Sequence, residues 1–98
     1  MLFAVQFRDA PDKLHLRAEF MTAHLDFLKT HADIIHLAGS LRREPDDLPA
    51  GGLWLVEAPD FATARKLFAD DPFWRAGLRA SVEIHRLAKA FPEISRPV

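Results

Sequence analysis

The sequence contains no cysteine, which excludes disulfides, thiolate zinc sites and thiol catalysis and fits a reducing cytoplasm. It also lacks an excess of basic residues, because 13 lysines and arginines stand against 14 acidic residues and the formal net charge is -1. A surface that follows a phosphate backbone needs such an excess. We therefore expect a cytoplasmic protein that does not bind nucleic acid.

Long hydrophobic runs and phosphate-binding loops are missing as well. The opening apolar run, Met1–Val5, is far too short to cross a bilayer, and no basic segment precedes it as in a signal peptide. The adjacent glycines, Gly51 and Gly52, lie between two predicted strands, whereas a nucleotide-binding loop joins a strand to a helix. We expect neither a membrane nor a cofactor as a partner of this chain.

Apolar residues are plentiful: 49% of the 98 residues are hydrophobic, including eight phenylalanines and two tryptophans. One domain of this size can therefore bury a core without disulfide or metal cross-links. Strict alternation puts Phe3, Val5 and Phe7 on one face of a strand over residues 1–8. Apolar residues then recur at steps of four and three over a helix at 13–30, and this stripe is expected to face the core: Leu14, Ala18, Met21, Leu25 and Leu28.

Three further strands, one helix and one irregular connection complete the pattern: strands over 34–41, 53–58 and 80–87, a helix that Asp60 caps, and a connection rich in Pro, Gly and Asp over 42–52. The order of elements is βαββαβ. It predicts an α+β, ferredoxin-like fold, in which an antiparallel four-stranded sheet carries two helices on one face.

The strands over 1–8 and 53–58 are apolar on both faces. Their second faces carry Leu2, Ala4, Leu53 and Leu55. A solvated face would alternate with polar residues, so a second copy of the chain is the simplest cover. We predict a homodimer through this sheet face. Three residues of the tail either add to the interface or belong to a frayed end: Phe91, Ile94 and Val98.

Five histidines are candidates for chemistry, and His24 stands out. It lies within the first predicted helix, on the stripe of Phe20 and Leu28, and is expected to be partly buried. Position alone favours a hydrogen-bonded core histidine over a base. The others are expected to be ordinary residues: His15, His31, His36 and His85. A metal site formed by His24, Asp71 and one strand histidine is a lesser alternative, because no ligand spacing such as HxxxH occurs.

The segment 70–74 supplies the second candidate. Asp71 precedes Pro72, and this pair is typical of the N-cap and first position of a helical turn. Phe73 and Trp74 are either core anchors or walls of an apolar pocket. Spacing alone favours the capping role of Asp71 over a catalytic role.

The chain as a whole resembles the YCII-related family over residues 1–88, and the tail over 89–98 lies outside the resemblance. The matching segments are the first strand, His24-Leu25, Ala38–Leu41, Gly52–Glu57, Ala62–Phe68, Asp71-Pro72-Phe73 and Ala76–Leu78. The resemblance implies a fold of the dimeric α+β barrel type and an active site formed by His24 and Asp71. Ser40 stands where many relatives look to have proline, and we expect its hydroxyl to cap a turn rather than to reach substrate.

If His24 and Asp71 meet, the carboxylate holds one imidazole nitrogen and leaves the other free for proton transfer. General acid-base catalysis of this kind needs no cofactor and suits lyase or isomerase steps, which the resemblance implies on small, often aromatic-derived metabolites. The candidate substrate contacts are Trp54, Phe73 and Trp74, and also Ser40 in the less favoured case that its hydroxyl does not cap a turn. Arg8 or Arg42 are candidates for holding an acidic group, and ordinary surface arginines are the alternative. The alternative is a non-catalytic ligand-binding or accessory dimer module, and a haem-degrading or cofactor-free oxygenase is less favoured.

Overall fold

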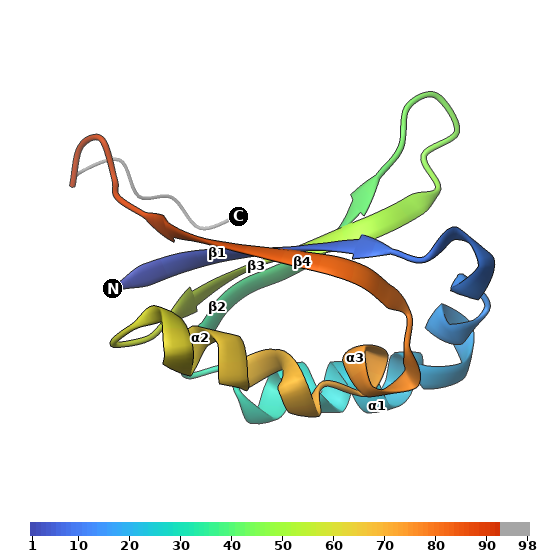
Figure 1. Cartoon of the computed structure of the whole chain (residues 1–98), viewed down its shortest axis with the longest axis horizontal. Coiled ribbons are helices and arrows are strands. Elements are labelled where there is room, and N and C mark those ends of the chain that lie inside the picture. Colours follow the sequence, from blue (N-terminus) through green and yellow to red (C-terminus); the bar gives the residue numbers. More distant parts are fainter. Residues whose placement is uncertain (93–98) are drawn as a thin grey trace.

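The computed structural model describes residues 1–92 and has the predicted α+β, ferredoxin-like βαββαβ arrangement (Figure 1). Its elements are β1 (Leu2–Asp9), α1 (Leu16–Thr30), β2 (Ile35–Arg42), β3 (Pro49–Glu57), α2 (Phe61–Leu67), α3 (Pro72–Ala76) and β4 (Arg79–Leu87). Short 3₁₀ turns at Pro11–Lys13 and Phe68–Asp70 precede α1 and follow α2. None of the described helices combines the length and the apolarity that crossing a bilayer requires.

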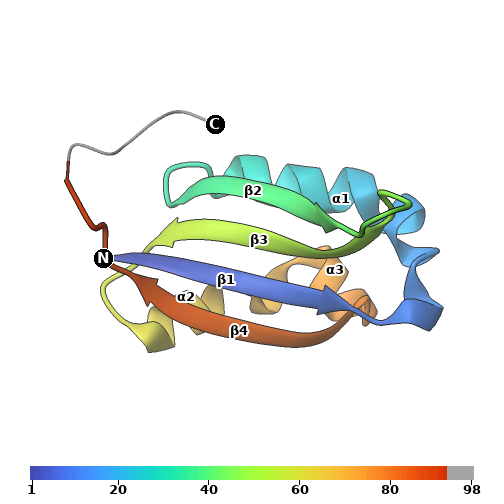
Figure 2. The same ribbon diagram turned by 90° about the horizontal axis from the view of Figure 1, so that it is seen from above.

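The four strands form one antiparallel sheet in the order β2-β3-β1-β4 (Figure 2). All the helices lie on one face of this sheet, and no described helix covers the other face (Figure 1). Figure 2 shows α1 on the side of β2, α2 on the side of β4, and α3 behind the central strands β3 and β1. The helices therefore meet beneath the two central strands, β1 and β3.

The core lies between the sheet and the helices. The alternation predicted for β1 is confirmed, because Phe3, Val5 and Phe7 are buried on the helix side. Phe7 packs edge-to-face against Trp54 of β3, at 5.0 Å between ring centroids, and against Phe68 after α2, at 5.5 Å. Aromatic contacts of this kind bury large apolar surfaces and stabilise the join between the two layers.

Strand β2 ends at Arg42 and strand β3 begins at Pro49, so the prediction of an irregular connection over 42–52 was wrong for its first residue and for its last four. Gly51 and Gly52 are paired within the sheet, opposite Arg8 and Phe7. A Cβ atom on Gly51 would lie 2.1 Å from the backbone oxygen of Phe7. The glycine is therefore required for the close approach of β3 to β1, and it does not mark a loop.

Helix α1 begins at Leu16 rather than at Lys13 and presents a different face to the sheet from the predicted one. Leu25, expected in the core, is 47% exposed, whereas His24 is the one residue of α1 that is fully buried, at 7% exposure. Phe27 and Leu28 pack against the core from a partly exposed position. Part of the apolar stripe of α1 is thus left for contacts outside the core.

The predicted helix caps are confirmed. The side chain of Asp60 accepts a hydrogen bond from the backbone N–H of Thr63 at 2.7 Å, at the start of α2. Asp71 caps α3 with Pro72 at the first helical position, and Gly77, with φ of 89°, ends that helix in the left-handed region. These caps satisfy backbone groups that a helix end leaves unpaired.

The face of the sheet without helices is apolar at its centre. Ala4 pairs with Leu55, and Leu55 in turn pairs with Leu37 of β2. All three side chains are only partly exposed within a single chain. In the tail, Phe91 is exposed, and the predicted interface residues Ile94 and Val98 lie outside the described residues.

Candidate active site

The structure brings His24 of α1 and Asp71 at the start of α3 into contact. His24 Nδ1 lies 2.7 Å from Asp71 Oδ1, and both side chains are buried. The same carboxylate oxygen also accepts the backbone N–H of Phe73 at 3.3 Å. Asp71 therefore both caps α3 and holds the imidazole of His24.

The contact determines which nitrogen of His24 is free. A carboxylate accepts hydrogen bonds, so Nδ1 carries the proton in the neutral ring and Nε2 carries the lone pair. Nε2 forms no hydrogen bond to a described residue, and it is not among the fully buried unpaired atoms, which are Asp71 Oδ2 and Arg79 Nε. Nε2 therefore retains access to the space beside it.

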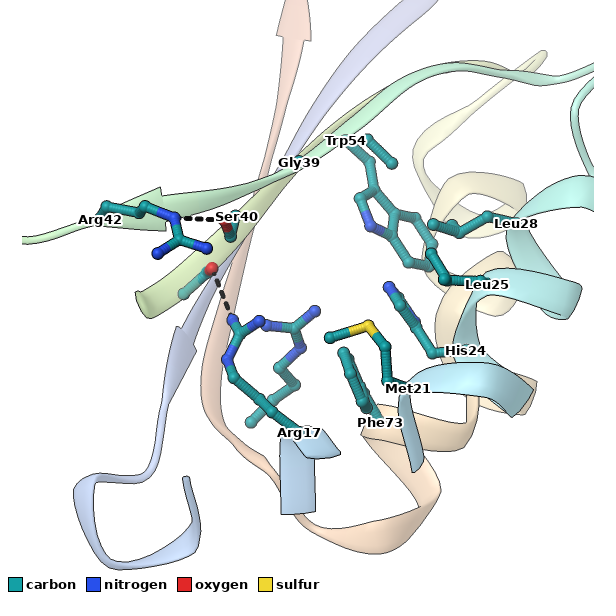
Figure 3. Close-up of a pocket in the computed structure, with 13 residues that line it drawn as sticks. Arg17, Met21, His24, Leu25, Leu28, Gly39, Ser40, Arg42, Trp54 and Phe73 are labelled. Atoms are coloured by element: carbon teal, nitrogen blue, oxygen red, sulfur yellow. Dashed lines mark hydrogen bonds between the residues drawn. The ribbon is translucent and has the colours of Figure 1, made fainter. Parts of the chain in front are cut away.

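That space is a pocket of about 170 Å³ between α1, α3 and strands β2 and β3 (Figure 3). Its apolar part consists of Met21, Leu25 and Leu28 of α1, together with Trp54 and Phe73. These three residues of α1 belong to the stripe that was predicted to enter the core. The volume is below the roughly 300–1,000 Å³ of drug-sized sites, so the pocket suits a small molecule.

Two aromatic rings flank the imidazole of His24. The ring of His24 stacks on Phe73, with 4.0 Å between centroids and 13° between planes. Trp54 faces His24 from β3 at 6.5 Å and 30°. Both aromatic rings are almost fully buried, so they fix the plane of the imidazole and keep water away from it.

A second polar cluster lies at the other end of the pocket. Asp9, at the end of β1, accepts a hydrogen bond from Arg17 Nε at 2.8 Å and another from Arg79 Nη1 at 2.7 Å. Arg17 Nη2 also donates to the backbone oxygen of Gly51 at 2.9 Å. Burial lowers the pKa of the Arg79 guanidinium, and the hydrogen bond to Asp9 opposes this shift. Arg17 and Arg79 line the pocket, together with Arg42.

Sequence reasoning missed this cluster, although two signals pointed to it. Asp9 continues the alternation of Phe3, Val5 and Phe7, which places a carboxylate on the buried face of β1. Gly52 makes room for a guanidinium, because a Cβ atom there would lie 3.2 Å from Arg79 Nη2. A buried acid at the end of an apolar strand, together with glycines in the neighbouring strand, indicates a buried basic partner.

Ser40 lies inside β2, paired with Gly52, so the prediction that its hydroxyl caps a turn was wrong. Strand β2 runs on to Arg42, because the strand that pairs with it begins earlier than predicted. The Ser40 hydroxyl accepts a hydrogen bond from Arg42 Nε at 3.2 Å, and both residues line the pocket (Figure 3).

Of the other residues predicted to contact substrate, some line the pocket and some do not. Trp54 and Phe73 line the pocket, whereas Trp74 and Arg8 are not among its lining residues. Trp74 packs edge-to-face on Phe68 at 4.6 Å, on the core side of α3. Consecutive residues of a helix point in different directions, which is why the two aromatic residues of α3 separate.

The remaining histidines are not part of the pocket. Within residues 1–92, no three His, Asp or Glu side chains are grouped as metal ligands, so the His24–Asp71 pair has no third ligand side chain beside it. His31 makes its hydrogen bond to the backbone oxygen of Phe27, one turn earlier in α1.

A model of the YCII-related domain matches residues 1–88. The chain belongs to the YCII-related domain family. Among solved structures, 5-chloro-2-hydroxyhydroquinone dehydrochlorinase from Burkholderia phenoliruptrix, in complex with 2,5-dihydroxybenzoquinone, is similar to this YCII-related chain. The two are 28% identical with a TM-score of 0.79, and the match covers 90% of this chain and 94% of the dehydrochlorinase.

More distant structures share the fold. An antibiotic biosynthesis monooxygenase is 17% identical with a TM-score of 0.52, over 94% of this YCII-related chain and 100% of that protein. A protein from Pseudomonas aeruginosa is 14% identical with a TM-score of 0.52, over 90% and 91% of the two chains. No curated protein matches the sequence. These likenesses support the α+β, ferredoxin-like fold.

Proposed function

We propose that this protein is a cofactor-independent enzyme of the lyase or isomerase type, which acts on a small oxygenated aromatic or carbonyl compound by general acid-base catalysis. The observation that carries the proposal is the buried 2.7 Å contact between His24 and Asp71, which leaves Nε2 open to an aromatic-lined pocket. The likeness to a dehydrochlorinase that binds a dihydroxybenzoquinone supports an oxygenated ring as the substrate class.

In the proposed reaction, His24 Nε2 takes the proton of a ring hydroxyl and returns it to the ring carbon that carries an anionic leaving group. It then takes the proton of a second hydroxyl while the leaving group departs with its bonding electron pair and a quinone forms. The net change is the loss of one acid molecule, and no oxidant or reductant is consumed. The first step alone is an isomerisation, so one base serves both reaction types.

Asp71 acts on this chemistry through His24. Its negative charge lies 2.7 Å from Nδ1 and stabilises the imidazolium that forms each time Nε2 takes a proton. The hydrogen bond from the backbone of Phe73 holds the carboxylate in place. Phe73 and Trp54 keep the reacting ring flat and exclude water, which strengthens the electrostatic interactions inside the pocket.

The test is an assay for chloride release and quinone formation from 5-chloro-2-hydroxyhydroquinone under anaerobic conditions. His24→Ala is expected to lower kcat by about 10²- to 10⁴-fold, the usual contribution of one general acid-base group. His15→Ala, which removes an exposed histidine outside the pocket, serves as the matched control. Full activity in His24→Ala contradicts the proposal.

A second candidate function is a non-catalytic ligand-binding or accessory module. The observation in its favour is that Asp71 also caps α3, so the pair can serve as a structural link between α1 and α3. In that case a ligand binds in the pocket and leaves unchanged. Replacement of Asp71, described in the Discussion, separates the two functions.

We further propose that the helix-free sheet face pairs with a second copy of the chain. Leu55 lies at the centre of that face, between Ala4 and Leu37. Leu55→Glu is expected to convert a dimer into a monomer in sedimentation experiments, because burial of an unpaired charge in an apolar interface is strongly unfavourable. Ala62→Glu, on the exposed side of α2, is the control. A monomeric wild-type protein contradicts the proposal.

A further inference from the structure

The end of the pocket opposite His24 carries positive charge that no facing acid balances. Among the described residues that line the pocket, three are arginines and none is an aspartate or glutamate. Asp9 does not line the pocket, but it accepts hydrogen bonds from Arg17 and Arg79 and so contributes one negative charge to two guanidinium groups. The side chains of Asp9 and Arg79 are almost fully buried, at 1% and 2% exposure. A partly desolvated positive charge of this kind is stabilised by an anionic ligand.

Asp71 does not balance this charge by direct contact. Its hydrogen-bonded oxygen is occupied by His24 and by the backbone of Phe73. Its other oxygen has no partner in the described part of the chain, and neither does Arg79 Nε. When His24 takes a proton from a substrate, the pocket gains a further positive charge.

Arg17, which is partly buried, and Arg79, which is almost fully buried, each keep a donor free. Arg17 uses Nε and Nη2 in its bonds to Asp9 and Gly51, so Nη1 has no described partner. Arg79 uses Nη1, so Nη2 has no described partner. Neither free nitrogen is among the fully buried unpaired atoms. The side chain of Arg17 is 13% exposed and that of Arg79 is 2% exposed, so Arg17 is the more accessible of the two.

The arginines and the imidazole share one neighbour. Phe73 lies between Arg17 and His24 (Figure 3). Its ring centroid is 4.0 Å from that of His24, and it is 5.6 Å and 5.3 Å from the guanidinium carbons of Arg17 and Arg79. One small ring at the edge of Phe73 can therefore meet the base on one side and the arginines on the other.

We propose that Arg17 and Arg79, held together by Asp9, bind an ionised oxygen of the substrate, so that the substrate enters as the anion of an acidic oxygenated ring. This inference rests on the proposed function and names the substrate class of the same site. The guanidinium groups donate charge-assisted hydrogen bonds to the ring oxygen, while the reacting hydroxyl faces His24 Nε2. The same donors stabilise the charge that moves onto that oxygen during the reaction.

Binding measurements test the proposal with two probes. The hydroxyls of 2,5-dihydroxybenzoquinone are vinylogous acids, so this probe is a dianion at pH 8, whereas hydroquinone is neutral. Arg17→Gln is expected to weaken binding of the dianion by about 10- to 100-fold, because hydrogen bonds to charged groups contribute about 1.5–3 kcal/mol each. Binding of hydroquinone is expected to change by less than about threefold. Titration calorimetry gives both dissociation constants.

Arg65→Gln is the matched control, because Arg65 lies on the exposed side of α2 and does not line the pocket. Binding of the dianion that is unchanged in Arg17→Gln, or equal affinity of the wild type for both probes, overturns the proposal. If Arg17→Gln does not fold, the wild type decides. Its affinity for the dianion must exceed that for hydroquinone and must fall as salt is added, since salt screens a charge-dependent contact.

The outcomes for this inference and for the proposed function are distinguishable. Dianion binding that depends on Arg17, in a protein that releases no chloride, supports the anion site and contradicts the elimination. Chloride release that continues in Arg17→Gln with an unchanged KM supports the elimination and contradicts the anion site.

Discussion

Asp71→Asn is expected to lower turnover by about 10³-fold while the protein stays folded. Asparagine has almost the shape of aspartate, so its oxygen can still accept from His24 Nδ1 and from the backbone of Phe73. What is lost is the negative charge 2.7 Å from the imidazole, which stabilises the ring after it has taken a proton. Steady-state kinetics measures kcat, and ¹⁵N shifts of His24 report which ring nitrogen carries the proton.

Asp70→Asn is the matched control, because Asp70 is the preceding residue and its side chain is exposed. Its turnover is expected to match that of the wild type. The free energy of unfolding of Asp71→Asn is expected to fall by no more than about 1–2 kcal/mol, since the hydrogen bonds can be kept. A much larger loss of stability, with His24 resonances that no ligand perturbs, favours the non-catalytic module.

Gly51→Ala is expected to reduce the free energy of unfolding by about 3 kcal/mol, at the upper end for overpacked sites. The added Cβ atom would lie 2.1 Å from the backbone oxygen of Phe7, and a backbone atom in the middle of a sheet cannot move aside. Strands β1 and β3 would have to separate where both are central in the sheet. Chemical denaturation followed by circular dichroism measures the change.

Gly39→Ala provides the comparison, because Gly39 also lies in the sheet but a Cβ atom there has no other atom within 4 Å. Its free energy of unfolding is expected to change by less than about 0.5 kcal/mol. Equal stability of the two variants would show that β1 and β3 can separate at Gly51 without cost. The backbone oxygen of Gly51 also accepts from Arg17, so folded Gly51→Ala is expected to bind the dianionic probe less tightly than the wild type.

Most of the architecture could be predicted from local pattern. Alternation of apolar residues located β1 and its buried face, and an aspartate before each short helix located the caps of α2 and α3. Such features depend on residues a few positions apart, which is the range over which backbone geometry repeats. The resemblance to the YCII-related family singled out His24 and Asp71, which spacing alone interpreted as a core residue and a cap.

The sequence by itself determined the order of elements and the sheet with a face left apolar, and its resemblance to the YCII-related family indicated the two residues for which chemistry is proposed. Only the tertiary structure decided that His24 and Asp71, 47 positions apart, are in contact, and that α1 turns His24 rather than Leu25 toward the sheet. It also brought Asp9, Arg17 and Arg79 together at one end of the pocket. These arrangements depend on how a helix rotates and where strands pair, and that choice is made by the packing of distant side chains.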